Sequence, residues 1–364
     1  MKKSLLAVAL LGTFAASAFA APSVTLYGRI DTGLVYTHQD LDKAGVDSTD
    51  TFEMKSGFST GSRWGLKGTE DLGNMKVGFV LENGFTSDDG VDAQAGRMFG
   101  REALVSVSGS YGTVYAGRML SLATDGGSLA MLGETSAFGN AYGVTTMKGS
   151  TGSAFDRYDN TLAYVSPTFA GFTGKVMYSF KADGKDGVGT ENKADADRYA
   201  AAGVQYKAGA FTGVLTTEYT MWGNTTHGDL DDGVAVILGG NYDFGVAKAF
   251  AKAAYFDNAV SYEDTFKLKD NLGVVKGWGA ELGTNVPAFG GNILAAVGYR
   301  EAKNVDKTSI KSERWNAGLG YTYAFSKRTN VYGAVAYAQE KIKGTAEDRT
   351  PNSVQAGFGL VHKF

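Results

Sequence analysis

The chain has 364 residues, a formal net charge of −3, no cysteine, 51 glycines and 4 prolines. This mildly acidic balance argues against a nucleic-acid partner, which needs a basic face, and no disulfide can staple the fold. Beyond the first twenty residues the sequence contains no apolar run of about 18 residues, so no transmembrane helix is expected. The abundance of glycine and of aromatic residues (19 Tyr, 21 Phe) favours a chain of β-strands and turns instead.

The N-terminus has the order of a secretory signal peptide. Lys2 and Lys3 precede an almost wholly apolar stretch, which ends in the small-x-small pattern of residues 18–20. We predict a cleaved signal peptide at residues 1–20 and one exported domain at residues 21–364. An N-terminal amphipathic helix is the alternative interpretation of this stretch.

The first segments that follow alternate with a period of two. In residues 24–37, Leu26 and Ile30 fall on one side, and Arg29 and Asp31 fall on the other. Such alternation continues along the chain in sixteen segments of about ten residues, as tilted membrane strands require. The predicted strands are residues 24–37, 61–70, 75–86, 97–109, 113–119, 158–167, 172–181, 196–207, 211–222, 233–244, 246–257, 273–286, 292–303, 312–325, 329–340 and 352–364.

Short and long connections alternate between these strands. The short ones are residues 71–74, 110–112, 168–171, 208–210, 245, 287–291 and 326–328. The longer, more polar ones are residues 38–51, 87–96, 120–157, 182–195, 223–232, 258–272, 304–311 and 341–351. Short turns at one end and long loops at the other are typical of an outer-membrane barrel. A soluble periplasmic β-protein remains the alternative.

The last segment closes the predicted barrel. Phe358, Leu360 and Phe364 fall on one face of residues 352–364, and Gln355 and Lys363 fall on the other. An even number of strands lets the last strand pair with the first, which removes the sheet edges. We therefore predict an all-β fold, a 16-stranded antiparallel transmembrane β-barrel.

Two further patterns concern the outer surface of this barrel. Aromatic residues gather near strand ends, as in the girdles that mark the two membrane interfaces; they include Tyr178, Phe180, Tyr242, Phe244, Tyr321, Tyr323 and Phe325. The alternation is weakest at residues 97–119, where Glu102 shares a face with Leu104. We take this wall as a candidate contact between subunits.

Several motifs occur in order along nearly the whole chain. They are VTLYGRIDTG at 24–33, GSRWGLKGTEDLG at 61–73, GREA at 100–103, YGTVYAGR at 111–118, SKRTN at 326–330 and HKF at 362–364. With these motifs the chain resembles the general porins of Gram-negative bacteria, most closely the betaproteobacterial type. Each motif is weak alone, and the ordered set is specific.

The resemblance implies a homotrimer in the outer membrane whose subunits are water-filled channels for ions and small hydrophilic solutes. It also implies that the third long loop, residues 120–157, folds into the lumen and narrows it. The family often carries Pro-Glu-Phe-Gly-Gly in this loop, whereas here Glu134 is separated from Phe138 by three residues and the proline is absent. The terminal aromatic residue, Phe364, is then the signal that the barrel-assembly machinery recognises.

The same resemblance implies a pore constriction with a basic wall and an acidic loop. The basic positions are Arg29, Arg63 and Arg101, with Lys67, Arg118 and Arg157 as additions; the loop positions are Asp125 and Glu134. Opposed charges of this kind set up a transverse field and an ion preference. Alternatively, a lumen arginine pairs with Asp31 or Asp159 and only holds the loop in place. The sign of the ion preference stays open.

Other functions have little support in the sequence. His38, His227 and His362 have no candidate serine nucleophile nearby, and neither a G-x-S-x-G nor an H-E-x-x-H pattern occurs, so we expect no enzyme, metal centre or cofactor. Aspartates in the loops, such as those at residues 229–232, could bind divalent cations linked to lipopolysaccharide, although solvated loops explain them more simply. A plugged structural barrel and a sugar-specific porin are the remaining alternatives. The second would need an inward aromatic ladder, which the strands lack.

Overall fold

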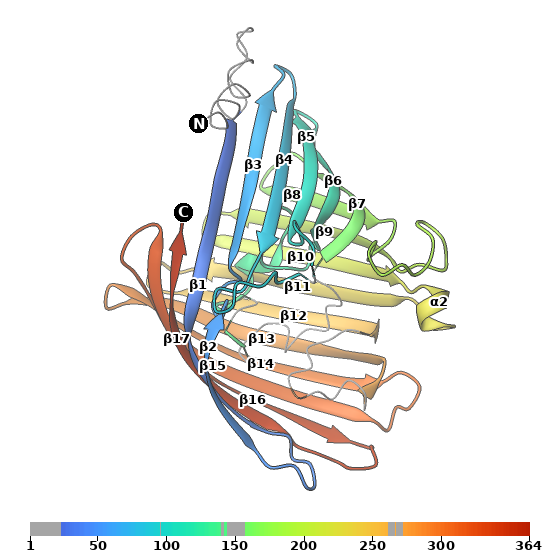
Figure 1. Cartoon of the computed structure of the whole chain (residues 1–364), viewed down its shortest axis with the longest axis vertical. Coiled ribbons are helices and arrows are strands. Elements are labelled where there is room, and N and C mark those ends of the chain that lie inside the picture. The colour runs from blue at the N-terminus through green and yellow to red at the C-terminus, as the bar shows by residue number, and fades with distance from the viewer. Residues whose placement is uncertain (1–22, 95, 140–141, 144–156, 261–265, 267–271) are drawn as a thin grey trace, which may run out of the picture.

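The computed structural model describes residues 23–94, 96–139, 142–143, 157–260, 266 and 272–364. The predicted signal peptide and part of the predicted third loop lie outside these ranges. Across the described ranges, no helix combines the length and apolar character that crossing a membrane demands. The regular secondary structure of these residues is almost entirely antiparallel strand (Figure 1).

The described chain forms one sheet of seventeen strand segments. In order these are β1 (Ser23–Asp40), β2 (Thr49–Ser56), β3 (Arg63–Asp71), β4 (Lys76–Gly84), β5 (Glu102–Gly109), β6 (Gly112–Leu120), β7 (Arg157–Val165), β8 (Phe172–Ser179), β9 (Arg198–Ala208), β10 (Phe211–Met221), β11 (Gly233–Asp243), β12 (Lys248–Ala259), β13 (Val275–Ala288), β14 (Gly291–Asn304), β15 (Lys311–Ala324), β16 (Thr329–Lys343) and β17 (Asn352–Lys363). Two short helices, η1 (Leu132–Glu134) and α2 (Asn224–His227), lie in loops.

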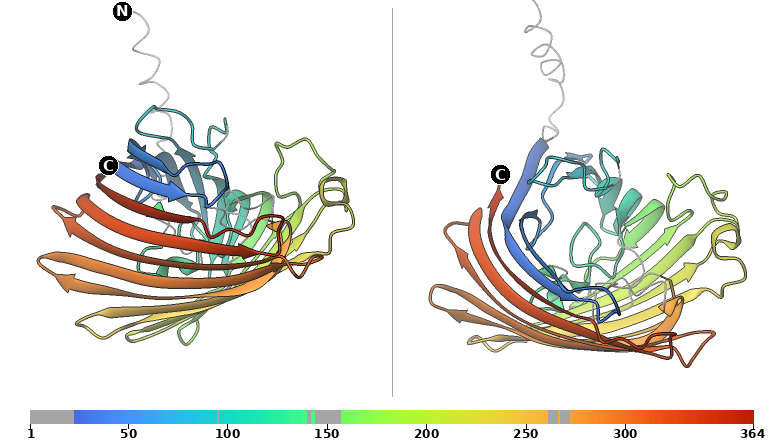
Figure 2. Two further views of the ribbon diagram at one scale, coloured as in Figure 1. Left: turned by 90° about the horizontal axis from the view of Figure 1, so that it is seen from below. Right: turned by 60° about the horizontal axis from the view of Figure 1, so that its bottom comes forward.

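The sheet closes on itself. β2 and β3 both pair with β1, each strand from β3 onward pairs antiparallel with the next, and β17 returns to β1 in an unbroken register from Arg29↔Lys363 to Asp40↔Asn352. Both figures show the blue first strand beside the red last strand, with the strands curving around a common axis (Figures 1 and 2). Because β2 and β3 pair with different halves of β1, together they occupy a single strand position of the barrel. We call each such strand position a stave, and this one is interrupted. The predicted closed barrel of sixteen antiparallel staves is confirmed.

The second stave differs from its prediction. The sequence predicts a start at residue 61 and a loop at residues 38–51, but β1 continues to Asp40 and residues 49–56 already form a strand. The alternation of Phe52 and Met54 with charged neighbours carried this signal. Residues 57–62 then interrupt the stave before β3 begins.

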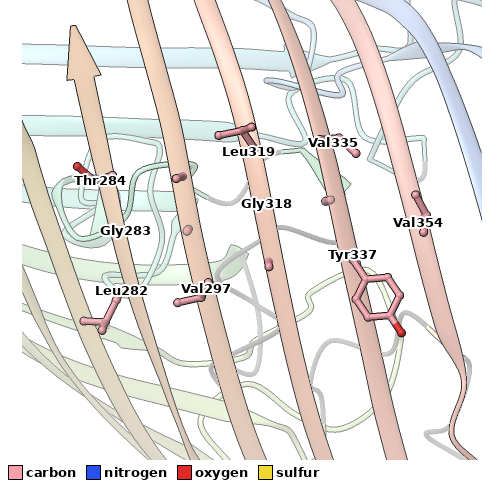
Figure 3. A pocket seen from close by; sticks show the side chains of 13 residues that line it. Leu282, Gly283, Thr284, Val297, Gly318, Leu319, Val335, Tyr337 and Val354 are labelled. Carbon is pink, nitrogen blue, oxygen red and sulfur yellow. The ribbon is translucent and has the colours of Figure 1, made fainter.

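The outer face of the barrel is apolar. Over β13–β17 an open hollow of about 580 Å³ lies among outward side chains such as Leu282, Val297, Leu319 and Val335 (Figure 3). None of the residues lining it is charged. This face suits lipid chains, because apolar side chains lose nothing by facing hydrocarbon, and the hydroxyl groups of Thr284 and Tyr337 are the polar side-chain groups in the lining.

Exposed aromatic residues gather at both ends of the strands, as predicted. Near the short turns Tyr242 and Phe244 pack with ring centroids 4.7 Å apart, and both are exposed. Near the long loops Trp278 and Tyr299 pack at 5.4 Å and are likewise exposed. An apolar band flanked by two aromatic belts is the arrangement expected at the two membrane interfaces.

The weak alternation at β5 and β6 has a different cause from the one inferred from the sequence. Glu102 and Leu104 lie on the face that the β6–β7 connection covers, and Leu104 is buried there against Leu122 and Leu129. The opposite face presents Val105, which is exposed. The mixed face therefore reflects packing of the chain on itself and gives no support to a subunit contact at this wall.

Closure at the β1–β17 seam leaves no room for a side chain at Gly33. A Cβ there would lie 2.4 Å from the carbonyl oxygen of Phe358 and 2.9 Å from the Cα of Gly359. At Gly333 in β16 the nearest atom to a new Cβ is 3.9 Å away. We expect Gly33→Ala to lower the free energy of unfolding by about 2 kcal/mol, because backbone must shift to admit the methyl group.

Gly333→Ala is the matched control and should leave stability unchanged. The measurement is the temperature at which the detergent-solubilised barrel loses its β-sheet circular dichroism and its compact migration on a gel. Equal unfolding temperatures for the two variants would contradict this account of the seam.

Candidate functional site

A polar hollow of about 430 Å³ collects most of the predicted basic residues, and we call it the arginine hollow. Its lining consists of Arg29, Gly57, Ser59, Thr60, Gly61, Arg63, Arg101, Leu120, Thr124, Asp125, Gly126, Gly127 and Arg157. Four arginines thus share one hollow with a single carboxylate. They come from β1, β3, β7 and the residue directly before β5. These strands are separate in sequence and belong to one run of paired strands, in which β4 and β6 lie between them.

The strand register brings two of these cations face to face. Arg29 lies directly opposite Arg63 in the β1–β3 ladder. Like charges in such positions repel each other, so the pair needs compensation. Part of it comes from Thr60, whose Oγ1 accepts hydrogen bonds from Nη1 of Arg29 and Nη2 of Arg63, both at 3.3 Å. One neutral oxygen therefore lies between the two guanidinium groups.

Glu82 on β4 provides further compensation. Nε of Arg101 donates a hydrogen bond to Oε1 of Glu82 at 2.6 Å, and Nη1 of Arg63 lies 3.9 Å from the same oxygen. The hydroxyl group of Tyr27 donates a hydrogen bond to the other carboxylate oxygen of Glu82, Oε2, at 3.0 Å. Glu82 thus faces two guanidinium groups, and a second buried carboxylate, Glu102, also lies within electrostatic reach of Arg101.

Asp125 is held by the fold of its own loop. A Cβ at Gly139 would lie 2.6 Å from Oδ2 of Asp125, and Gly139 has a φ of +62°, so both space and backbone conformation favour glycine there. Asp125 also lies within electrostatic reach of Lys252 on β12. The carboxylate thus lies against Gly139 of its own loop and lines the arginine hollow.

Residues 121–139 pack on the side of the sheet opposite the exposed apolar side chains. Leu122, Leu129 and Met131 are buried there among side chains from β5 through β12. Three hydrogen bonds tie this segment to separate strands: Ser128 N to Glu102 Oε1 at 2.8 Å, Lys175 Nζ to Leu129 O at 2.9 Å and Ser136 Oγ to Glu281 Oε1 at 2.7 Å. These contacts fix the segment at widely spaced points around the barrel.

Glu134, the second predicted loop carboxylate, does not line the arginine hollow. Asn241 on β11 donates to the carbonyl oxygen of Glu134 at 2.7 Å, and Nζ of Lys207 on β9 lies 3.5 Å from its Oε1. Glu134 therefore interacts with a different part of the wall from Asp125. The sequence placed the two carboxylates together because nothing local distinguishes them.

Lys67 and Arg118 also lie outside the lining of this hollow. Nζ of Lys67 is 5.1 Å from the ring centre of Tyr27, a cation–π contact. Arg118 sits in a bulge of β6, where its Nη1 lies 2.5 Å from Oδ1 of Asp159. Nη1 of Arg97 lies 3.0 Å from the other oxygen of Asp159. For Arg118 the alternative of a structural pair with Asp159 is thus the one observed.

Four residues at or near this site were missed by sequence reasoning. Glu82 and Lys252 occupy inward positions of predicted strands, so counting strand parity could have found them. Thr60 falls between the predicted loop and the predicted second strand. Tyr332 on β16, far along the chain, donates a hydrogen bond to Asp31 near the site. No pattern in the sequence alone points to those two.

Phe364 lies beside the first strand. Its backbone exchanges two hydrogen bonds with Gly28, at 3.1 and 3.0 Å. Its ring occupies the space that a side chain at Gly28 would need, since a Cβ there would lie 2.3 Å from the ring. The aromatic residue therefore packs across the seam where the barrel closes.

Comparison with known proteins agrees with this architecture. A family model described as Gram-negative porin matches residues 7–343. The chain is 34% identical over 397 aligned positions to an outer membrane porin protein of Bordetella pertussis, with 100% of both chains covered. It superposes on the anion-selective porin from Comamonas acidovorans with a TM-score of 0.69 and 27% identity, covering 94% of this chain and 100% of that one. The trimer form of OmpT from Vibrio cholerae shares the fold at a TM-score of 0.62 and 16% identity, covering 95% and 100%.

Proposed function

We propose a charged constriction for this chain, which belongs to the Gram-negative porin family and is therefore an outer-membrane channel for passive diffusion rather than an enzyme. In this proposal the arginine hollow is the basic wall, and the loop of residues 120–157 enters the lumen and narrows it. The observation that supports it most directly is the gathering of four arginines and Asp125 around one hollow. The hydrogen bonds of Ser128 and Ser136 to opposite walls support the course of the loop.

The proposed constriction acts by electrostatics. Cationic side chains on one side and Asp125 on the other create a transverse field, which orients dipolar solutes as they pass and favours one sign of ion. Among the basic residues, the wall would consist of Arg29, Arg63, Arg101 and Arg157. Lys67 and Arg118 would lie outside the narrow point, and Glu134 would tie the loop to β9 and β11.

We further propose that the channel prefers anions among small hydrophilic solutes. Charges within a Debye length, about 10 Å at 0.1 M salt, decide this preference, so the local excess of arginine outweighs the net charge of −3. The likeness to a porin described as anion-selective supports the same sign. A sugar-specific channel has less support, because the lining of the arginine hollow contains no aromatic side chain.

Arg63→Ala and Lys67→Ala test the constriction as a matched pair, since both remove a cation from β3 four residues apart. We expect Arg63→Ala to move the reversal potential in a KCl gradient toward zero, because it removes a charge from the narrow point. Lys67→Ala should leave the reversal potential near the wild-type value. The measurement uses purified protein in a planar lipid bilayer, and equal shifts for both variants would contradict the proposed wall.

We propose that the channel assembles as a homotrimer, with its apolar outer face against lipid and neighbouring subunits and its loops among lipopolysaccharide. The shared fold with a porin known in a trimer form supports this assembly. We expect a native mass in mild detergent of three times the monomer mass, measured by light scattering. A monomer that retains full channel activity under those conditions would count against the trimer.

We also propose that residues 1–20 direct export and that Phe364 is the signal read by the barrel-assembly machinery. The packing of Phe364 across the closing seam supports a role in barrel formation. Deleting Phe364 should reduce the amount of folded barrel in the outer membrane while leaving the single-channel conductance of the assembled fraction unchanged. Phe325→Ala, an exposed aromatic in the turn after β15, is the control and should assemble normally. Normal assembly of the deletion variant would refute this role.

A further inference from the structure

We infer that residues 57–62, the interruption between β2 and β3, form a positioning element that holds Arg29 and Arg63 in the arginine hollow. Asp31 and Tyr332 anchor this element, and Thr60 is the residue that contacts the two guanidinium groups. The inference rests on the proposed charged constriction. It adds a second element, separate from the loop of residues 120–157, that shapes the basic wall.

The register shows how much chain the interruption contains. On β1, only Ile30 and Asp31 separate the residue paired with Arg63 from the residue paired with Ser56. The opposite stave places six residues, 57–62, in the same interval. The extra chain cannot fit in the ladder and must leave the plane of the sheet, and Gly57 begins this departure with a φ of +73°.

Asp31 anchors the segment through its carboxylate. Oδ2 accepts hydrogen bonds from the backbone N–H groups of Ser59 at 2.8 Å and Thr60 at 2.6 Å. Oδ1 accepts the hydroxyl proton of Tyr332 at 2.7 Å. The side chain is completely buried, so these donors replace its hydration. Because two of these donors are backbone N–H groups, the carboxylate fixes the path of the main chain at residues 59–60.

Aromatic packing supports the segment from the other side. Phe58 is buried against Tyr142 and Tyr332, with ring centroids 5.8 and 6.3 Å apart. Ser59 Oγ donates to the hydroxyl of Tyr142 at 2.9 Å. Gly357 on β17 provides space for this packing, since a Cβ there would lie 2.7 Å from the Phe58 ring. The segment is thus fixed at three successive residues.

The result of this anchoring is the position of Thr60. Its Oγ1 meets Arg29 and Arg63 at once, and Nε of Arg63 also donates to the carbonyl oxygen of Gly61 at 2.9 Å. A guanidinium group has donors and no acceptor, so these oxygens restrict its rotation without cancelling its charge. A carboxylate in the same place would cancel one of the two positive charges. The segment therefore orders two cations while leaving their charge available to a passing anion.

Asp31 could instead influence permeation through its own negative charge, and the two roles predict opposite signs. Removing a negative charge near the pore would raise the preference for anions. Releasing Arg29 and Arg63 from their fixed positions would lower it. A measured sign therefore separates positioning from direct electrostatics.

The first experiment uses Thr60→Val, which keeps the shape of the side chain and changes no charge. We expect the reversal potential in a KCl gradient to move toward zero by at least about half of the shift caused by Arg63→Ala, with noisier open-channel current. Thr60→Ser retains the oxygen and should restore the wild-type value. Unchanged reversal potential and noise in Thr60→Val would overturn the inference.

The second experiment tests the anchor. Tyr332→Phe removes one donor to Asp31 and leaves every charge in place, so anion preference should fall; Asp31→Asn removes the charge, and its anion preference should also fall. A rise in anion preference for Asp31→Asn would overturn the anchoring role in favour of direct electrostatics. Circular dichroism and heat stability identify variants that do not fold. If Asp31→Asn does not fold, the selectivity of Tyr332→Phe decides whether Asp31 is an anchor. Wild-type selectivity in Tyr332→Phe would refute the anchor.

The reversal potentials of Arg63→Ala and Thr60→Val together distinguish the constriction from the positioning element. If Arg63→Ala shifts the reversal potential and Thr60→Val does not, the proposed constriction stands and the positioning element is refuted. If neither shifts it, the constriction itself is wrong and the inference falls with it.

Discussion

Every backbone N–H and C=O group inside a bilayer must find a partner in the protein, since each unsatisfied group costs several kcal/mol. In this chain the requirement is met by the pairing of β17 with β1 over twelve residue pairs. That closure separates an apolar outer face from an interior where polar side chains are tolerated. Arg29 depends on this closure directly, because it belongs to the closing strand β1 and lies between Lys363 on one neighbour and Arg63 on the other.

In the interior of the barrel, positively charged side chains lie close together and repel each other. Arg29 and Arg63 are paired across a ladder, and Arg101 lies close to the same carboxylate as Arg63. Full neutralisation would remove the repulsion together with the field that discriminates between solutes. In the structure, Arg101 donates a hydrogen bond to the carboxylate of Glu82, whereas Arg63 donates to the neutral oxygens of Thr60 and Gly61. Charge is thus ordered more than it is cancelled.

The sequence was sufficient for those features that depend on local periodicity. Alternation gave the strands, turn residues gave the connections, and the parity of the last strand indicated its closure with the first. Features that depend on contacts between distant residues were not predictable. Whether Asp125 or Glu134 joins the arginines depends on partners such as Gly139 and Asn241, and Thr60 acquires its position from Asp31 and Tyr332. The weak alternation around Glu102 was misread for the same reason, since its cause is a segment that packs on it from elsewhere.

The central claim is that ordered arginines dominate the field at the narrow point of the channel. The most direct test is the zero-current potential of the wild-type protein in a planar bilayer with concentrated KCl on one side and dilute KCl on the other. If chloride passes more readily than potassium, the dilute side becomes negative, and this is the result that the account predicts. A positive dilute side would mean a preference for cations and would contradict it.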